Sequence, residues 1–443
     1  MLHGPFSNTH IKKSTTMLPS TFLSSLLFIS TVSAQATYPN TTQTILRVDP
    51  GRYGPEIEEY HYYYDQWPIG LAISSAGRFF ASYTRGNYSF TLGEAINKTA
   101  EIPYPADLNL PVSQLNTSWN GIPFGSGNSS GLISVQALHI TPANDRRDET
   151  LWVVDTGRPT ISSATGPSMP YAQPGGPKIL GISLNNDSVY ATYTFPAAVH
   201  FPDSYMNDIR FDLRPGVTAS GKGIAYIVDS SDEGRPGFIM LDLGTGESWR
   251  RLTQHPSTLR IDRDVPSYQG VPFYQRTMGV PVQTLREGLD GLQLSPDVER
   301  LYYSPLTSDY LFSIPTENLR LKIEDDNLAE IKAANNVTNY AQRGGNANGF
   351  EGDSNGLIYQ LMPEHNAVYA YNPATLQTEP FVRDPRIIWP DGASVGEDGY
   401  MYLNINQLSY QPMWNNGTDG RIHPGAVLRC KLPNGGRKIT SLG

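Results

Sequence analysis

One motif in the chain combines a carboxylate and a guanidinium at a spacing that could serve ligand binding. An apolar run ends on Asp155, and Arg158 follows three residues later, in the segment Leu151-Trp-Val-Val-Asp-Thr-Gly-Arg-Pro159. A bidentate contact from Asp155 could orient Arg158 and leave further N–H donors for an oxygen of a ligand. We therefore name Arg158 as the best candidate for a catalytic group, and a purely structural role in the turn is the alternative.

Motifs for conventional catalysis are incomplete. Gly352-Asp-Ser-Asn-Gly356 matches the pattern of a nucleophile elbow, but a strand-like run follows it where the elbow needs a helix, so we interpret it as a hairpin turn. The eight histidines form no zinc-binding pattern. Cys430 is the single cysteine, and we expect it to be an apolar filler. The sequence predicts a site without a cofactor; a calcium site of Asp and Asn oxygens in a channel is the alternative.

Short β-rich segments recur six times and must position these groups. Each is an apolar run that follows a turn and ends on a polar residue. Repeats of this kind, about 40 to 80 residues apart, predict an all-β fold, a six-bladed β-propeller with one sheet per repeat. The six runs begin at Phe79, Leu151, Ile224, Leu301, Leu357 and Tyr400.

The propeller fold predicts where a site would lie. The innermost strand of each blade begins on the face where the next strand ends, so residues at these two places surround one mouth of the central channel. Strand starts predict Gln136 and Asp208 at this mouth, and strand ends predict Asp229 and Ser304. The same argument, with Arg158 and Tyr303 added as hydrogen-bond donors, predicts the substrate-binding residues Trp67, Tyr83, Asp155, Arg158, Asn207, Asp290, Tyr303, Asn348, Gln360, Asp391 and Asn404. Turn capping by Asn and Asp side chains is the alternative for each single residue.

Aromatic residues are abundant, with 26 Tyr, 15 Phe and 6 Trp, and they form a dense cluster at Tyr60-His-Tyr-Tyr-Tyr-Asp-Gln-Trp67. We expect most of them to pack between blades. Any that line the mouth would suit a flat, conjugated or terpenoid ligand.

Two further elements are predicted from pattern. Ring closure should pair an early strand near Thr44–Val48 with a strand around Ala426–Lys431, because closure removes an exposed sheet edge. The segment Glu324–Asn335 should form a short amphipathic helix with Leu328 and Ile331 on its apolar face.

The N-terminus and the charge balance bear on location and partners. Residues 17–34 contain an apolar run that ends in Val32-Ser-Ala34, which predicts a signal peptide over residues 1–34, with Met17 as a possible start. Residues 35–443 then form one propeller domain. A net charge of −9 provides no basic surface for nucleic acid, and we expect no membrane association after cleavage of the signal.

Eight Asn-X-Ser/Thr sequons support secretion and glycosylation, because chance alone would give about three or four. They lie at Asn40, Asn87, Asn97, Asn116, Asn128, Asn186, Asn336 and Asn416.

The chain resembles the major royal jelly/yellow protein family, as a fungal member. The resemblance rests on Leu151–Arg158, Asn207-Asp-Ile-Arg-Phe-Asp212, Asp290-Gly-Leu-Gln-Leu-Ser-Pro-Asp297, Leu301-Tyr-Tyr-Ser-Pro-Leu306, Trp389–Tyr402 and Asn406-Gln-Leu408. It implies a secreted, glycosylated six-bladed propeller that binds small molecules in its channel, and it does not imply one reaction. Paired cysteines of the insect members are absent here. Trp67-Pro-Ile-Gly70 stands where the more distant lactonase-type propellers carry an acidic metal ligand.

Three functions follow as hypotheses. Similar fungal propellers of secondary metabolism act as pericyclases that join a tropolone-type quinone methide to a terpene alkene by hetero-Diels–Alder addition, and we expect such a secreted, cofactor-free enzyme. Arg158, Asn207 or Tyr303 could then polarise a carbonyl of the electron-poor partner. The alternatives are a non-catalytic carrier of small aromatic or amine ligands and, third, a metal-dependent lactonase.

Overall fold

The computed structural model is a six-bladed β-propeller, as the repeats predict. It describes residues 50–84, 89–109, 117–119, 122–124, 131–163, 166–173, 175–275, 279 and 281–439. The expected signal peptide, residues 1–34, lies outside this described part. Within it, no helix is both long and apolar enough to cross a membrane.

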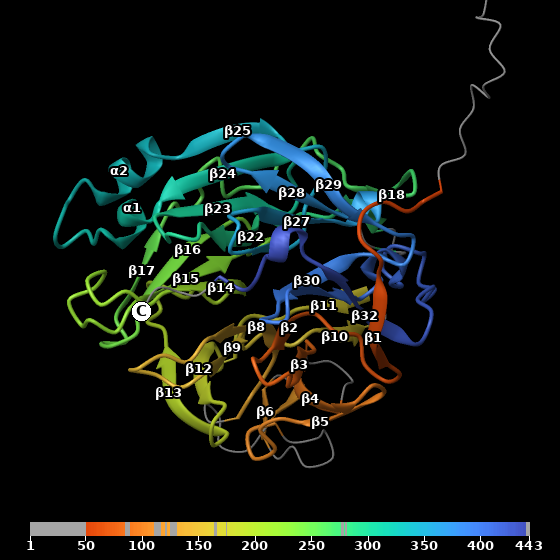
Figure 1. Ribbon diagram of the computed structural model, residues 1–443, viewed down its shortest axis with the longest axis horizontal. Helices are drawn as coiled ribbons and strands as arrows, with labels where there is room; N and C mark the ends of the chain where they lie inside the picture. Colours follow the sequence, from red (N-terminus) through yellow and green to blue (C-terminus); the bar gives the residue numbers. More distant parts are fainter. Residues whose placement is uncertain are drawn as a thin grey trace, which may run out of the picture. The chain divides into compact units, whose positions relative to one another are not determined.

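Each blade is a four-stranded antiparallel sheet, and in the first five blades the strands follow the chain from the centre of the ring to its rim (Figure 1). The first three blades are β2 (Leu71–Ile73), β3 (Phe79–Ser82), β4 (Leu92–Asn97) and β5 (Ala100–Pro103); β8 (Val135–Thr141), β9 (Thr150–Asp155), β12 (Lys178–Ser183) and β13 (Ser188–Thr194); and β14 (Met206–Asp212), β15 (Ile224–Asp229), β16 (Gly237–Asp242) and β17 (Ser248–Arg251).

The remaining strands complete the ring. They are β22 (Leu289–Leu294), β23 (Arg300–Pro305), β24 (Tyr310–Pro315) and β25 (Thr338–Gln342); β26 (Phe350–Gly352), β27 (Ile358–Met362), β28 (Ala367–Asn372) and β29 (Gln377–Arg383); and β30 (Pro390–Val395), β31 (Tyr400–Ile405), β32 (Gly425–Lys431) and β1 (Glu58–Tyr63). The inner strands β2, β8, β14, β22, β26 and β30 each contact the next around the circle, and β30 contacts β2. The circle of inner strands is therefore closed around a central channel.

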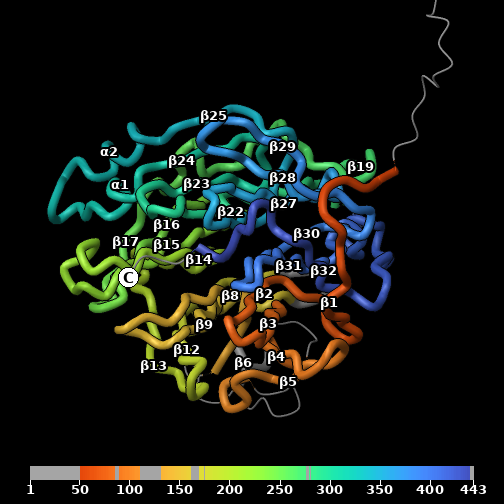
Figure 2. The backbone as a smooth tube through the Cα atoms, in the orientation of Figure 1, coloured from red at the N-terminus to blue at the C-terminus, as the bar shows by residue number. Residues whose placement is uncertain are grey.

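The sixth blade closes the ring with the first strand of the described chain. β1 pairs antiparallel with β32, with Glu58 opposite Arg429 and Tyr63 opposite Gly425, and Figure 2 shows the two strands side by side. The predicted partner segment is confirmed, but it pairs with Glu58–Tyr63 and not with the predicted Thr44–Val48, which lies outside the described residues. The tyrosine-rich cluster supplies that strand, because alternate side chains such as His61 and Tyr63 are buried against the blade.

Antiparallel pairing divides the connections between two faces. On one side, which we call the mouth face, the inner strands begin and the second strands end; on the other, the turn face, lie short turns such as the one between β26 and β27. That turn contains Asp353–Gly356, so the interpretation of Gly352–Gly356 as a hairpin turn is confirmed. The connections of the mouth face carry the hairpins β6 (Thr117–Trp119) with β7 (Ile122–Phe124), β10 (Ile161–Ser163) with β11 (Gly166–Ser168), β18 (Ser267–Tyr268) with β19 (Val271–Pro272), and β20 (Tyr274–Gln275) with β21 (Gln283–Thr284), and the 3-10 turns Pro363–His365 and Leu408–Tyr410.

The two short helices α1 (Thr316–Arg320) and α2 (Ala329–Asn335) lie on the turn face between β24 and β25, and a 3-10 turn, Pro433–Gly435, follows β32. The helix expected at residues 324–335 is present in part, but the prediction of which residues form its buried apolar face is wrong. Ala329 and Ala333 are buried, whereas Leu328 and Ile331 are 49% and 57% exposed. Small alanine side chains let the helix pack closely against the blade, and the longer aliphatic residues are left outside.

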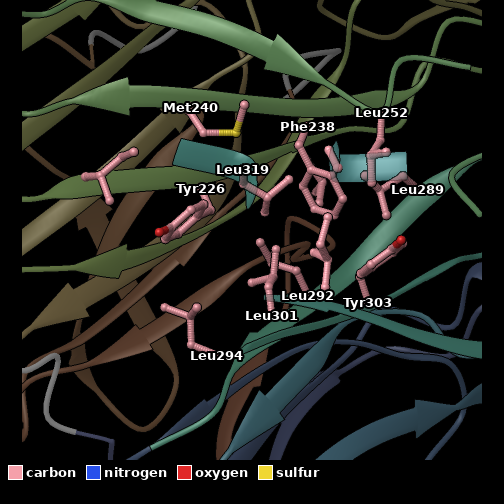
Figure 3. Packing of buried hydrophobic residues seen from close by; sticks show 14 of the residues in the cluster. Tyr226, Phe238, Met240, Leu252, Leu289, Leu292, Leu294, Leu301, Tyr303 and Leu319 are labelled. Carbon is pink, nitrogen blue, oxygen red and sulfur yellow. The ribbon is translucent and has the colours of Figure 1, made fainter. Parts of the chain in front are cut away.

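The hydrophobic core lies between neighbouring blades. Figure 3 shows this packing between the third and fourth blades, where the rings of Phe238 and Tyr303 meet edge to face with centroids 4.9 Å apart. Cys430 is buried in a corresponding cluster, and burial raises the pKa of its thiol to about 12. Its expected role as an apolar filler agrees with this position.

Candidate functional site

Polar side chains of four inner strands, and of the segment just before β26, surround a small cavity in the channel near the mouth face. Its volume is about 40 Å³, which accommodates one or two water-sized groups. The polar residues that line it are Gln136, Asn207, Asp208, Arg210, Asp290, Asn348 and Asp391.

β-Bulges aim several of these side chains into the channel. The ladder of the inner strand is interrupted at Gln136 in β8, at Asn207 and Asp208 in β14, at Asp290 in β22 and at Asp391 in β30. A bulge leaves one residue unpaired and turns its side chain away from the regular alternation. The same local device in four blades therefore produces the polar ring.

A chain of hydrogen bonds links one half of the ring. Tyr205 donates from its hydroxyl to Gln136 Oε1 at 2.6 Å, and Gln136 Nε2 donates to Asn207 Oδ1 at 2.9 Å. Asn207 Nδ2 then donates to Asp290 Oδ1 at 2.5 Å. The other carboxyl oxygen of Asp290 is buried and has no hydrogen-bond partner among the described residues. This half of the ring thus ends on an oxygen that is available to a ligand.

The other half of the ring is centred on Asp391. Asn348 donates to one oxygen of this carboxyl group and Asn406 donates to the other. The backbone comes very close here, since a Cβ on Gly392 would lie 2.8 Å from the carbonyl oxygen of Ile69. Only glycine permits this approach of the strands.

Burial raises the pKa values of three carboxyl groups at this mouth. We call Glu287, Asp290 and Asp391 the mouth carboxyls. Burial raises the pKa of Asp391 to about 7, and burial together with the charges of Asp232 and Asp391 raises the pKa of Glu287 to about 8. Burial also raises the pKa of Asp290 well above its usual range, with Glu287 and Asp391 adding to the rise. Near neutral pH the cluster therefore contains carboxylic acids that can donate hydrogen bonds.

Arg210 forms the floor of the cavity, and sequence reasoning missed this role. Its guanidinium donates to Asp208 Oδ1, to Gln293 Oε1 and to the carbonyl of Phe350 at 2.6–2.7 Å. The signal was present in the sequence, because Asp208 and Arg210 are two residues apart in one strand and project from the same face.

Below Arg210 lies a second, smaller chamber of about 20 Å³, which Arg210 also lines. The last described residues, 432–439, lie there on the turn face, and we call them the tail. Lys438 of the tail borders the chamber beside Glu351, and Asp353 pairs with Lys438 in an isolated bridge. Arg210 and the tail together separate the cavity from the turn face.

Whether a predicted site residue lines the cavity depends on which strand carries it. Asn207, Asp290, Asn348 and Asp391, which stand at strand starts, line the cavity, as do Gln136 and Asp208. The residues expected at strand ends do not line it, because the inner strand stands between the second strand and the channel. They are instead packed into the blades: Tyr83, Asp155, Tyr303, Gln360 and Asn404, together with the additional positions Asp229 and Ser304.

The expected pairing of Asp155 with Arg158 is wrong. Asp155 forms an ion pair with Lys178 at 3.0 Å, and both side chains are completely buried. Arg158 contacts Glu233 at 2.7 Å and donates to the carbonyls of Pro170 and Asp203 at 3.0 and 2.6 Å. The Gly157 backbone, at φ +64°, turns the chain between them and sends the two side chains to different partners.

The other predicted residues have contacts of their own. Tyr303 shares a hydrogen bond of 2.7 Å with Ser257, and Asn404 donates to the carbonyl of Gly70 at 2.8 Å. Trp67 does not line the cavity, and its ring lies tilted against that of His423 with centroids 4.5 Å apart. Gln360 is completely buried, and its amide has no hydrogen-bond partner among the described residues.

An aromatic segment crosses the mouth face beside the ring. The connection between the third and fourth blades brings Tyr268 against Tyr410 and Phe273 against Trp389 and Trp414, with ring centroids 5.0–5.6 Å apart. Trp389 stands two residues before Asp391. A mostly buried aromatic cluster therefore lies near Asp391, and Tyr410 and Trp414 are its partly exposed members.

The sequence left a calcium site in the channel as an alternative and predicted eight glycosylation sites. In the described part of the chain, no group of three or more His, Cys, Asp or Glu side chains is arranged to hold a metal ion. The four described sequon asparagines are all exposed, as a glycan requires; they are Asn97, Asn186, Asn336 and Asn416. Asn40, Asn87, Asn116 and Asn128 lie outside the described residues.

Comparisons with known proteins agree with the resemblance seen in the motifs. A family model described as "Major royal jelly protein" matches residues 133–420. Protein yellow of Drosophila subobscura is 30% identical over 178 residues, which cover 38% of this chain and 27% of that protein. Protein yellow of Drosophila melanogaster is 29% identical over 178 residues, covering 38% of this chain and 28% of that protein. The matched region thus spans little more than a quarter of these curated relatives.

Solved structures were compared as well. A luciferin-regenerating enzyme aligns with a TM-score of 0.48 and 9% identity, covering 87% of this chain and 97% of that chain. A virginiamycin B lyase from Staphylococcus aureus aligns with a TM-score of 0.42 and 12% identity, covering 85% of this chain and 99% of that chain.

Proposed function

This chain belongs to the major royal jelly protein family, and from that premise we propose that it binds a small organic molecule at the mouth face and acts there as a cofactor-free pericyclase. The reaction is an intermolecular hetero-Diels–Alder addition of a tropolone-type quinone methide to a terpene alkene, as part of fungal secondary metabolism. The observation that supports it most is the buried oxygen of Asp290 that lacks a hydrogen-bond partner among the described residues, in a carboxyl group whose pKa burial raises well above its usual range.

A protonated carboxyl group suits this reaction. The addition forms one C–C and one C–O bond, breaks no σ bond and transfers no proton, so it needs neither a nucleophile nor a base. A hydrogen bond from a neutral carboxylic acid to the carbonyl oxygen of the quinone methide draws electron density from it and favours the addition. Holding both partners in a reactive pose lowers the barrier further.

The size of the cavity determines how the partners would lie. A volume of about 40 Å³ admits only the carbonyl end of a ligand. The larger parts of both partners would then rest on the mouth face outside the cavity. There the partly buried rings of Tyr410 and Trp414 cover the buried Tyr268 and Phe273.

A second candidate function uses the same carboxyl groups in the opposite state. Once ionised, Glu287, Asp290 and Asp391 would attract the ammonium group of a small amine, and the net charge of −9 favours cations. The chain would then be a non-catalytic carrier of aromatic amines. The two candidates predict opposite responses to pH.

The test of catalysis measures adduct formation from a quinone methide precursor and a terpene alkene, with purified protein, between about pH 6 and pH 9. A carboxyl group donates only below its pKa, so the acceleration should be full near pH 6 and should decline at higher pH as Asp290, whose pKa burial raises well above its usual range, loses its proton. Asp290→Ala should slow the catalysed reaction by about 100-fold, which is typical for loss of one donor to a developing oxyanion.

The exposed Asp262 provides the matched control, because its side chain is 85% exposed. Asp262→Ala should leave the rate unchanged. If the rate and stereochemistry of adduct formation with the protein equal those in buffer alone, the pericyclase proposal is wrong. Calorimetric titration with tyramine then tests the carrier function. A carrier requires saturable binding without turnover, with an affinity that increases between about pH 6 and pH 8.

We also propose that the protein is secreted and glycosylated. The exposed sequons at Asn97, Asn186, Asn336 and Asn416 support this. An endoglycosidase should reduce the apparent mass of the protein recovered from the culture medium, and recovery of unmodified protein from cells alone would argue against it.

A further inference from the structure

A second concave site lies on the turn face, opposite the mouth carboxyls. It is a groove of about 680 Å³ between the second and third blades, and its walls come from β13 and from the turns β8–β9, β14–β15 and β16–β17. This volume is in the range of small-molecule sites and is far larger than that of the cavity in the channel. We call it the rim groove and describe it by Trp152, Arg147, Tyr190, Tyr193 and Lys222.

Arg147 presents an unused donor in the rim groove. Its Nη2 donates to the carbonyl oxygen of Lys222 at 2.8 Å, which links the turns of the two blades. Its Nη1 is shielded from solvent and has no hydrogen-bond partner among the described residues. A buried donor without a partner is costly, so an acceptor from a ligand would be favoured at this position.

Two tyrosines flank this guanidinium. Burial raises the pKa values of Tyr190 and Tyr193, and the positive charge of Arg147 opposes the rise in both, which shows that it lies near both phenol groups. Tyr193 donates from its hydroxyl to the carbonyl of Leu243 at 2.6 Å, so its ring is held across the two blades. The ring of Tyr190 is 49% exposed and rests edge-on against Trp152, with centroids 6.1 Å apart. It offers an open aromatic surface beside the cation.

The charge of the lining limits the ligand. Arg146, Arg147 and Lys222 face Asp145 and Asp148, which leaves one net positive charge. The carboxylate of Asp148 is already occupied, because Ser183 Oγ and Asn185 Nδ2 donate to it at 2.7 Å each. One net positive charge suits a single negative charge on the ligand and does not favour a multiply charged phosphate.

We propose that the rim groove binds a small aromatic monoanion of the aryl carboxylate class. Its carboxylate accepts hydrogen bonds from the Arg147 guanidinium, a pairing for which the planar fork of arginine is well suited. Its ring packs against Tyr190. This site does not depend on the pericyclase proposal, since it lies on the other face and shares no lining residue with the cavity in the channel. The sequon asparagine Asn186 also lines the groove, so the binding test uses protein treated with an endoglycosidase.

Isothermal titration calorimetry with 4-hydroxybenzoate and its neutral isostere 4-hydroxybenzamide tests the proposal on the full chain. We expect saturable binding of the benzoate with one site per chain. The affinity for the amide should be at least about tenfold lower. Arg147→Gln should weaken benzoate binding by about tenfold or more and should abolish the preference over the amide. The control Arg52→Gln removes one charge from an exposed side chain beside Asp384 and should change neither affinity.

Because Arg147 links two blades, Arg147→Gln could lower stability, and its thermal unfolding is measured alongside. Tyr190→Ala provides the second variant, since a half-exposed ring on the outermost strand can be removed without opening the core. It should weaken both probes by a similar factor, because it removes the ring contact and leaves the cation. Equal binding of benzoate and amide, no saturation up to ~10 mM, or unchanged affinity in either variant would each overturn the proposal.

Discussion

The buried charged residues at the ends of the second strands are held by specific partners rather than displayed to a ligand. Asp155 illustrates this, because it pairs with Lys178 and also accepts from the backbone N–H groups of Ile133 and Ser134 at 2.8–2.9 Å. Lys178 in turn donates to the carbonyl of Gly131 at 2.7 Å. The ion pair therefore joins β9 and β12 to the segment that leads into β8. Its role is to hold the second blade together.

Asp155→Asn should be strongly destabilising. The substitution preserves the shape of the side chain but leaves the completely buried Lys178 ammonium without a counter-charge, which typically costs about 3–5 kcal/mol. The free energy of unfolding from urea denaturation measures it. Asp262→Asn, at an 85% exposed position paired with Arg260, should change stability by less than ~0.5 kcal/mol. A loss below ~1 kcal/mol for Asp155→Asn would contradict the assignment.

Among the elements, β1 and the bulged inner strands have the clearest roles. β1 comes from the beginning of the described chain and completes the sixth blade, so it closes the ring without a covalent link. Its alternation places Tyr63 in the core, where the hydroxyl donates to Asn404 at 3.0 Å, and leaves Tyr64 outside. The bulges act at the inner edge of four of the sheets, where they aim polar side chains into the channel.

Tyr63 and Tyr64 form a matched pair for testing the closure. Tyr63→Ala removes a completely buried ring and should lower the free energy of unfolding by about 3–5 kcal/mol, because a cavity remains and Asn404 loses a partner. Tyr64→Ala removes a ring that is 54% exposed and should cost less than ~1 kcal/mol. Denaturation midpoints of the two variants provide the comparison, and similar losses in both would argue against β1 as the closing strand.

In the propeller as a whole, the described residues leave the channel blocked rather than open from end to end. Arg210 occupies its middle, and the tail covers its end on the turn face. Lys438 of the tail is buried beside Glu351, and burial raises the pKa of Glu351 while the positive charges of Arg210 and Lys438 oppose the rise. A ligand of the channel would therefore approach from the mouth face.

Two neighbouring residues of the tail, the buried Lys438 and the exposed Arg437, provide a matched pair of variants for testing its role. Lys438→Ala should destabilise the propeller by about 1–3 kcal/mol near neutral pH, because Glu351 loses one of the two cations that stabilise its charge. Arg437 is exposed next to it, and Arg437→Ala should be nearly neutral. Thermal unfolding measures both. A neutral Lys438→Ala would show that the tail does not contribute to closing the channel.

Much of this molecule follows from its sequence. The six repeats, their turns and the period-2 alternation predict the propeller, because strands and hairpins are specified by residues that are close in the chain. The same local reasoning places Asn207, Asp290, Asn348 and Asp391 at strand starts, and these residues do line the cavity.

Only the tertiary structure decided which groups meet. Arg210 donates to the carbonyl of Phe350, 140 residues away, and Asn404 accepts from Tyr63 across 341 residues. The partner of Asp155, the floor of the channel and the small volume of the cavity all depend on such contacts. They arise when the ring closes, and closure joins segments whose spacing along the chain carries no local signal. The sequence by itself therefore determined the fold and the positions of the inner-strand residues, and the closed ring determined which of the predicted side chains face the channel.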